Sequence, residues 1–306
     1  MADYLWKGID VSSCQTSVDF NKVKAAGYNF VILRAGYGKF LKQKDTMFES
    51  HYKAAKAAGL LVGAYWYSYA TTVEDAKLEA DTCIKVIADK QYDMPIWYDI
   101  EERKTLNTGR TNVSNIATTF CNALENAGYY CGIYGGQELA TQYLTETIRT
   151  RYAFWLAQYL KTPKYTGQYG IWQFGVAGAK SGNNPTGAKS VPGVPGECDM
   201  DYCYVDYPTK IKEKGMNGFT KTPTPEPAKT NPYPEPTTTV KEGDTGDSVK
   251  WLQWYLTDYG FFDSKIDGVF GNITLGGLLA YQFKNELDVD GKCGPATRNS
   301  LKSYKK

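Results

Sequence analysis

Short apolar runs alternate with amphipathic stretches over about the first 207 residues of the chain. The apolar runs are rich in β-branched and aromatic residues, which is typical of buried strands. Eight strands are predicted, at residues 6–12, 29–38, 60–70, 94–101, 129–136, 152–159, 170–175 and 198–205. The stretches between the first five strands carry apolar residues at helical spacing and predict helices, three of which end at Gly27, Gly59 and Gly128.

The alternation of strands and helices predicts the fold class. Repeated β-α units place their strands in parallel, and eight strands in one α/β domain suggest a closed or nearly closed barrel of the TIM type. No clear helical pattern separates the later strands. The last part of the barrel is therefore expected to be irregular.

The character of the chain changes after residue 207. Residues 208–240 include the stretch FTKTPTPEPAKTNPYPEPTTTV, which is rich in Pro and Thr, lacks periodicity and predicts a semi-rigid, extended linker. Residues 241–306 regain helical patterns and predict a small all-α domain. The chain is thus expected to hold a barrel at 1–207, a linker at 208–240 and a helical domain at 241–306.

A short internal repeat lies in the helical domain. The stretches IDGVFGNIT (266–274) and VDGKCGPAT (289–297) share the pattern [IV]-D-G-x-x-G-x-x-T at a spacing of 23 residues. Asp-Gly favours a turn, and the trailing threonine suits a helix N-terminus. Because an apolar-periodic helix precedes each copy, the pattern predicts two equivalent turns.

Composition narrows the possible chemistry. The formal net charge is +2, so the chain as a whole has no strong footprint for nucleic acid. The single histidine, His51, lies in a predicted amphipathic helix and is expected to be a surface or interface residue. One histidine argues against Ser-His-Asp or Cys-His catalysis and against a His-rich zinc site. Aromatic residues reach 14%, and such rings can form stacking platforms for flat ligand faces.

The seven cysteines form an odd set without a CxxC pair, which predicts reduced and mostly buried thiols. Cys198 and Cys203 flank the segment CDMDYC and are the one pair considered for a bridge in an oxidising setting. The N-terminal stretch MADYLWKGIDVSS has no basic segment followed by a long apolar run. Neither a secretion signal nor a membrane span is therefore expected.

The stretch DMPIWYDIEE (93–102) ends an apolar strand in closely spaced carboxylates. Strand parity puts Asp99 and Glu101 on one face and Glu102 on the other. The C-terminal ends of strands build the active site of a parallel barrel, which is where these two side chains are expected. If the first and last strands are neighbours, Asp10 and Asp199 lie beside each other and face the fourth strand.

A cleft of carboxylates and aromatic rings suits glycoside hydrolysis, which requires a protonated acid, a second carboxylate and apolar platforms for sugar faces. Because side chains at i and i+2 run parallel, Asp99 and Glu101 are not expected to straddle a sugar ring; one is the acid and the other its tuner. The nucleophile is then Asp10, Asp199 or the acetamido group of the substrate. The alternative use of such a cluster is a Ca²⁺ or Mg²⁺ site, against which the lack of a D-x-D-x-D-G loop weighs, and no cofactor is expected.

Candidate substrate-binding residues surround this cluster. Parity places Tyr65 and Tyr67 on one face of the third strand, and they are expected to line the cleft with Tyr134 and Trp172. Core packing is the alternative for each of the four rings. Arg34, near the end of the second strand, either orients a carboxylate or forms a structural ion pair.

The motifs KGIDVSSCQTSVDF, FVILRAGYG, PIWYDIE, CGIYGG, FWLAQY, GIWQF and CDMDYC follow one another along the chain. Together they resemble the glycoside hydrolase family 25 lysozymes across residues 5–207. The resemblance implies an irregular (β/α)5(β)3 barrel. It also implies N-acetylmuramidase activity, the cleavage of the β-1,4 bond from N-acetylmuramic acid to N-acetylglucosamine in peptidoglycan.

Four carboxylates match the motifs of that family. The resemblance implies that Glu101 is the acid/base, that Asp99 is its partner in the D-x-E pair, and that Asp10 is the aspartate of the GID motif. Asp199 matches the aspartate of the terminal motif. The chain departs from the family there, because Asp201 stands where asparagine is usual.

The tail resembles the helical peptidoglycan-binding domain 1 family through GDTGDSVKWLQWYL and the two Asp-Gly repeats, although LLAYQF departs from the usual A-L-x-x-F-Q. A catalytic domain, a linker and a wall-binding domain without a signal peptide resemble a phage endolysin, made in the cytoplasm and released by a holin. A bacterial autolysin exported by another route is the second source. The partner implied is peptidoglycan, expected in a Gram-positive wall, with neither nucleic acid nor membrane.

Two other functions stay open at this point. One is a wall-binding protein with an inactive barrel, against which the intact Asp99 and Glu101 pair weighs. The other is a glucosaminidase or chitinase of similar fold. The sugar left at the new reducing end separates that activity from a muramidase.

Overall fold

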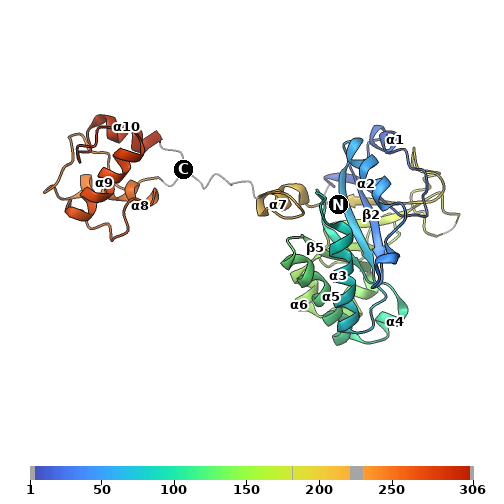
Figure 1. Cartoon of the computed structure of the whole chain (residues 1–306). Helices are drawn as coiled ribbons and strands as arrows, with labels where there is room; N and C mark the ends of the chain where they lie inside the picture. The colour runs from blue at the N-terminus through green and yellow to red at the C-terminus, as the bar shows by residue number, and fades with distance from the viewer. Residues whose placement is uncertain (1–3, 181, 221–229, 304–306) are drawn as a thin grey trace. The chain divides into compact units, whose positions relative to one another are not determined.

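The structure is a computed structural model that describes residues 4–180, 182–220 and 230–303. The chain folds into two compact units, residues 1–224 and 225–306. The first unit is a closed eight-stranded barrel (Figure 1). Its strands are β1 (Trp6–Val11), β2 (Phe30–Tyr37), β3 (Leu61–Tyr67), β4 (Ile96–Asp99), β5 (Cys131–Gly136), β6 (Ala153–Ala157), β7 (Ile171–Ala177) and β8 (Cys198–Cys203). The predicted barrel is confirmed.

Helices fill the first five connections of the barrel. The amphipathic pattern predicts those in the first four, and the resemblance to a (β/α)5(β)3 barrel implies the fifth. They are α1 (Phe20–Ala25), η1 (Leu41–Gln43), α2 (Phe48–Ala57), α3 (Val73–Ile87), α4 (Arg103–Leu106), α5 (Arg110–Asn126), η2 (Leu139–Tyr143) and α6 (Glu146–Arg151). Helices α3 and α5 lie side by side outside the sheet (Figure 1). Gly27, Gly59 and Gly128 follow α1, α2 and α5 with φ of 87°, 72° and 86°, a left-handed conformation that favours glycine.

The last strand reverses direction. Strands β1 to β7 pair in parallel, whereas β8 runs antiparallel between β7 and β1. The register sets Asp199 opposite Asp10 and Asp201 opposite Gly8. The first residues of β8 therefore lie at the rim where the other strands end.

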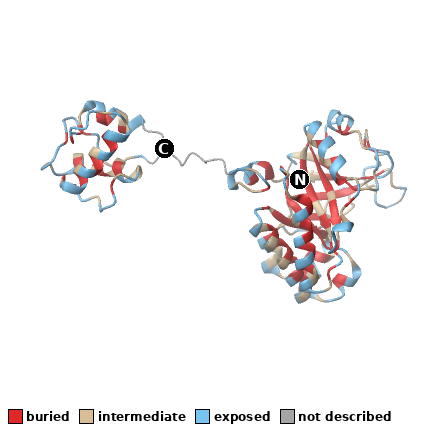
Figure 2. Ribbon diagram, in the orientation of Figure 1, coloured by how far each residue is buried: buried red, intermediate tan, exposed pale blue. Residues whose placement is uncertain are grey.

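Two apolar layers lie on opposite sides of the barrel wall. Trp97 and Trp155 belong to the inner layer, while Trp66 and Tyr98 belong to the outer layer under the helices. Tyr98 stacks on Phe120 of α5 with ring centroids 3.7 Å apart. Figure 2 shows the strands as buried and the helices as exposed on their outer faces. The alternation along β4 agrees with the parity predicted for Asp99 and its neighbours.

The environments of His51 and of the pair Cys198 and Cys203 bear on two expectations from the sequence, a surface histidine and a conceivable disulfide. His51 is only 4% exposed, because α1 packs on α2 and sets Phe20 edge-on to the imidazole at 5.6 Å. Cys198 and Cys203 lie at opposite ends of β8, too far apart along an extended strand for a disulfide. The cysteines are free thiols, and only Cys14 is exposed.

The segment after β8 closes the floor of the barrel. Helix α7 (Tyr207–Lys214) places the Tyr207 ring 5.9 Å from that of Trp97 in the inner layer. Beyond the helix, Asn217 is fully buried, and its Nδ2 donates to the carbonyl oxygens of Tyr92 and Met94 at 3.1 and 2.9 Å. The predicted linker start at residue 208 thus lies inside the first unit, because an amphipathic helix there buries one face against the barrel.

The second unit consists of α8 (Asp247–Asp258), α9 (Asn272–Lys284) and α10 (Pro295–Ser303) around an apolar core. Residues before 241 already pack on it, since Lys302 forms an ion pair with Glu235 at 2.8 Å and Asn231 donates to the carbonyl of Trp251 at 3.0 Å. Residues 221–229 of the predicted linker lie outside the described residues.

The two Asp-Gly turns are held in the same way. Gln253 of α8 donates through Nε2 to Asp267 at 2.8 Å and accepts through Oε1 from the backbone N–H of Gly268 at 2.9 Å. Gln282 of α9 does the same with Asp290 at 2.9 Å and Gly291 at 3.0 Å. The predicted equivalence of the two turns is confirmed.

In the described part of the chain, no helix combines the length and apolar character that crossing a membrane requires.

Replacing Asn217 with Ala is expected to lower the free energy of unfolding of the barrel by about 2–4 kcal/mol, because buried backbone groups lose their partners. Its Oδ1 also accepts from the backbone N–H of Tyr130 at 2.7 Å, and its φ of 56° is unfavourable for alanine. Urea unfolding followed by near-ultraviolet circular dichroism measures the change. Asn115→Ala on the exposed face of α5 is the control, and equal stability of the two variants would contradict the assignment of residues 208–219 to the barrel.

Candidate active site

A cavity of about 290 Å³ opens at the rim where β1 to β7 end. Eight of the nine predicted site residues line it: Asp10, Arg34, Tyr65, Tyr67, Asp99, Glu101, Tyr134 and Asp199. Residues from β1, β2, β3, β4, β5 and β8 thus converge on one site. Reasoning from the sequence did not identify Ser12, Gln15, Trp155, Tyr159 and Gln173 as lining residues.

The carboxyls of Asp99 and Glu101 differ in exposure. Asp99 is the last residue of β4 and is 4% exposed, and its Oδ1 has no hydrogen-bond partner among the described residues. Burial, and then the charge of Glu101, raise the pKa of Asp99 well above its usual value, while Arg34 lowers it. Glu101 is exposed. Its pKa is nevertheless raised, first by desolvation of the carboxyl and then by the charge of Glu102.

The charge of Glu101 raises the pKa of Asp99, whereas the neighbouring charge that raises the pKa of Glu101 is that of Glu102. Only Glu101 is exposed toward the open cavity, whereas Asp99 is closed in. A proton held by this pair therefore reaches a ligand through Glu101.

Asp10 lies on β1 beside Asp199, as predicted for neighbouring first and last strands. Its Oδ2 accepts a hydrogen bond from Gln173 Nε2 of β7 at 2.8 Å. Burial raises the pKa of Asp10 well above its usual value, and the charges of Asp199 and Asp201 add to the effect. Asp10 is therefore held rigidly in the wall of the cavity.

Asp199 is the carboxyl across the mouth from Glu101. Burial, and then the charge of Glu101, raise the pKa of Asp199 to about 6. At neutral pH this value leaves Asp199 mostly ionised. The rim thus combines an anion on β8 with a group after β4 that keeps its proton more readily than a free carboxyl.

Arg34 is the cation of the cavity. Its Nε donates to Asp45 Oδ2 at 2.7 Å, and its Nη2 donates to Ser13 Oγ at 2.8 Å. Arg34 thus forms the structural ion pair that was one of its two expected roles, and its charge also lowers the pKa of Asp99.

The tyrosines are fixed by hydrogen bonds and ring contacts. Tyr134 OH and Tyr159 OH both donate to Gln173 Oε1, at 2.8 and 3.0 Å. The ring of Tyr134 lies 4.4 Å from that of Trp155, and the ring of Tyr65 lies 6.2 Å from it. These rings form a rigid wall beneath the carboxyls, since each is packed on a buried tryptophan.

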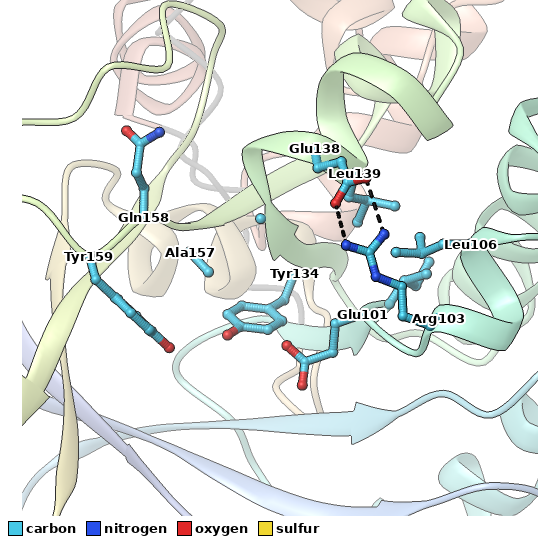
Figure 3. A pocket seen from close by; sticks show the side chains of 11 residues that line it. Glu101, Arg103, Leu106, Tyr134, Glu138, Leu139, Ala157, Gln158 and Tyr159 are labelled. Carbon is cyan, nitrogen blue, oxygen red and sulfur yellow. Dashed lines mark hydrogen bonds and ion pairs between the residues drawn. The ribbon is translucent and has the colours of Figure 1, made fainter. Parts of the chain in front are cut away.

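A second cavity shares part of its lining with the first, and Figure 3 shows the side chains around it. Glu101, Tyr134 and Tyr159 line both cavities. At its edge, Arg103 donates to Glu138 in a bidentate ion pair, with both distances 3.1 Å. The cleft is therefore long enough to extend on both sides of the Glu101 carboxyl.

Trp172 does not line the cleft, and this prediction is wrong. Its ring is 2% exposed in the outer layer, and its Nε1 donates to the carbonyl of Gln158 at 2.8 Å. Gln173, one residue on, points into the barrel instead. Both faces of β7 are buried, so no polar face along the strand indicates which parity points inward.

The arrangement can perform acid catalysis on a neutral, ring-shaped substrate. It offers a raised-pKa carboxyl at the opening, an ionised carboxylate opposite, and tyrosine rings for stacking. No group of three or more His, Cys, Asp or Glu side chains in the described ranges has an arrangement suited to a metal ion.

Comparison with known families gives two matches. Residues 9–183, more than half of the chain, match the model of glycosyl hydrolases family 25. Residues 245–301 match that of the putative peptidoglycan binding domain. The first match includes Asp10, Asp99 and Glu101 and ends before β8.

Individual relatives agree with these matches. The autolytic lysozyme of Clostridium acetobutylicum is 30% identical over 196 residues, which cover 64% of this chain and 55% of that protein. The spore cortex-lytic enzyme of Halalkalibacterium halodurans is 42% identical over 62 residues, 20% of this chain and 19% of that protein. The CTP1L endolysin structure has a TM-score of 0.57 and 26% identity, covering 68% of this chain and 70% of that chain. The chain thus spans only about half the length of the lysozyme it matches.

Asp99→Asn is expected to raise the melting temperature at pH 7. A carboxyl whose pKa is higher in the folded than in the unfolded chain binds its proton more tightly when folded. The fold therefore loses stability as the pH rises above about 4, by about 1.4 kcal/mol for each pH unit that separates the unfolded and folded pKa values. Because the pKa of Asp99 is raised, this loss of stability is present at neutral pH. The uncharged amide of asparagine removes the loss.

Melting curves of wild type and Asp99→Asn between pH 4 and pH 8 measure this effect. The two curves are expected to converge toward pH 4, where the wild-type carboxyl is protonated in the folded state and partly protonated in the unfolded state. Asp81→Asn is the control, since this residue is exposed on α3 of the same unit. A variant that is less stable than wild type at pH 7 would show that Asp99 is a stabilising anion.

Proposed function

The chain belongs to glycosyl hydrolases family 25, and we propose that it is a peptidoglycan hydrolase. The bond cleaved is the β-1,4 bond between N-acetylmuramic acid and N-acetylglucosamine. One observation carries the proposal: Asp10, Asp99, Glu101 and Asp199 meet in one cavity walled by tyrosines. Two carboxyls with apolar platforms are what glycoside hydrolysis requires.

Glu101 is the general acid in this proposal. It is the exposed member of the Asp99 and Glu101 pair, and desolvation and the charge of Glu102 favour its protonated form. Protonation of the glycosidic oxygen by such a group makes the departing sugar neutral. The two adjoining cavities support this role, because Glu101 lies where they meet and a disaccharide would have its linkage there.

The positive charge that develops on the sugar faces an anion. Asp199 suits this role, because its pKa of about 6 leaves it ionised at neutral pH and it interacts with Glu101 across the mouth. It acts either as nucleophile or by stabilising an intermediate formed with the substrate's acetamido group. Asp10, fixed by Gln173, lies beside Asp199 and contributes a second acceptor to the same wall.

The second unit supports a cell-wall substrate. Its match to the putative peptidoglycan binding domain covers both Asp-Gly turns, α8, α9 and most of α10. Binding of this unit to the wall would raise the local concentration of glycan strands near the barrel. We place the action of the enzyme on the wall of Gram-positive bacteria, as an endolysin or autolysin.

Glu101→Gln is expected to lower the rate of wall lysis by at least about 10²-fold, because the amide supplies no proton to the leaving oxygen. Turbidity loss of purified peptidoglycan measures this rate. Glu102→Gln is the matched control. The Glu102→Gln variant is expected to lyse walls at the wild-type rate at pH 5. On the alkaline side of the profile of rate against pH, its rate is expected to fall at a lower pH than that of wild type, because removing the neighbouring charge lowers the pKa of Glu101.

Mass spectrometry of borohydride-reduced digests identifies the bond that is cleaved. Reduced muramic acid at the new ends is the expected result. Reduced glucosamine would instead indicate a glucosaminidase, and peptidoglycan binding without new ends would indicate an inactive barrel. Wild-type rates for Glu101→Gln would overturn the assignment of the acid.

A chain ending at Thr224 is expected to keep its rate on soluble glycan fragments and to lose most of its activity on intact walls at low enzyme concentration. Sedimentation with purified sacculi measures binding, and turbidity measures lysis. Equal sedimentation of the shortened and full chains would show that the second unit does not carry wall affinity.

A further inference from the structure

Strand β8 brings another aspartate, Asp201, into the barrel directly behind the site. Asp201 is 0% exposed, and its Oδ1 accepts a hydrogen bond from the indole N–H of Trp155 at 2.8 Å. Its Oδ2 is buried and receives no hydrogen from an amide, indole or hydroxyl donor in the described ranges. The polar neighbour that is left to Asp201 is the carboxyl of Asp10, which lies on the adjoining strand β1 and interacts with it electrostatically.

The balance of donors and acceptors requires a proton in this contact. A carboxylate has acceptors only, so two carboxyls form a hydrogen bond only when one of them is protonated. Asp10 already has one neutral donor, Gln173, and Asp201 has one, Trp155. No lysine or arginine in the described part of the chain forms an ion pair with either. The guanidinium of Arg34 is engaged by Asp45.

We propose that Asp10 and Asp201 share one proton, that Asp201 holds it and donates it to Asp10, and that Asp201 is thereby a positioning residue. The proposal rests on the proposed function, because it concerns how Asp10 is presented to the substrate. Asp201 is inaccessible, whereas Asp10 is 7% exposed at the cavity wall. The negative charge of the pair is less costly at the position nearer to water.

An asparagine at 201 could replace this protonated acid atom for atom. Its Oδ1 would accept from Trp155, and its Nδ2 would donate to Asp10. The aspartate differs from the amide in one respect, which is that it loses its donor when the pH rises. The structure thus gives the chain a pH-dependent hydrogen bond at a position where a permanent one would fit.

Titratable groups face the pair from several elements. They are Asp199, Cys198 and Cys203 on β8, Tyr65 on β3, Tyr134 on β5 and Tyr159 after β6. Burial raises the pKa of the thiols and the tyrosine hydroxyls and keeps them neutral, so the negative neighbour is Asp199. Burial, and then the charge of Asp199, raise the pKa of both carboxyls of the pair. Below the pKa of the pair one proton is held and Asp10 is fixed; above it the two anions repel and Asp10 moves.

The test compares Asp201→Asn with Asp201→Leu on purified peptidoglycan across pH 5 to 9. Asp201→Asn is expected to keep kcat within about threefold of wild type at pH 6, since the amide supplies the same donor. In the profile of kcat against pH, the alkaline fall in kcat is expected at a higher pH for Asp201→Asn than for wild type. Asp201→Leu keeps the branching at Cγ but not the donor and is expected to lose at least about 30-fold in kcat.

A readout without substrate separates this proposal from the proposed function. The infrared difference spectrum of wild type minus Asp201→Asn at pH 7 is expected to contain the carbonyl stretch of a protonated, buried carboxylic acid. The band is measured whether or not the protein hydrolyses peptidoglycan. Absence of the band, an unshifted alkaline limb, or a folded Asp201→Asn as inactive as Asp201→Leu would each overturn the shared proton.

Discussion

The antiparallel pairing of β8 between β7 and β1 decides where the carboxyls of the cleft lie. A parallel eighth strand would send its first residues to the floor of the barrel. In the observed direction, Asp199 stands opposite Asp10 at the rim and Asp201 lies one step deeper. The hydrogen bonds of Gln173 and Trp155 to these groups depend on the same register. The chemistry of the mouth is therefore a consequence of how the barrel closes.

The cleft gathers more negative charge than its surroundings can neutralise. Five carboxyls face or adjoin the cavity, and the one arginine that lines it is paired with Asp45, outside that set. Burial, and then the neighbouring carboxylate charges, raise the pKa values of Asp10, Asp99 and Glu101, so that protons take the place of the missing cations. Such a cluster costs folding free energy, and in the proposed function it would supply the proton for acid catalysis, the common conflict between stability and function.

A rigid aromatic interior supports this electrostatic arrangement. Trp97 and Trp155 fill the barrel under the mouth, with ring centroids 5.7 Å apart, and Tyr207 closes it from below. Because these rings are closely packed, the tyrosines above them have little freedom to move. The hydroxyls of Tyr134 and Tyr159 converge on Gln173, which in turn fixes Asp10. Packing and hydrogen bonding thus hold the reactive groups in one geometry.

Local spacing along the chain was enough to predict several features, and pairing between distant strands was needed for the others. The eight strands, the helix ends at glycine, the two equivalent turns of the tail, and the shared face of Asp99 and Glu101 could be predicted. Each follows from a period of two or 3.6 residues or from turn chemistry, which neighbouring residues specify.

The inward face of a fully buried strand and the direction of β8 could not be predicted. Trp172 was therefore expected in the cleft, where Gln173 lies instead. The same holds for α7, whose apolar face packs on the barrel floor, and for the position of Asp201 near Asp10 on the paired strands. These features depend on register between strands far apart in the chain, and a pattern along one strand carries no information about its partner.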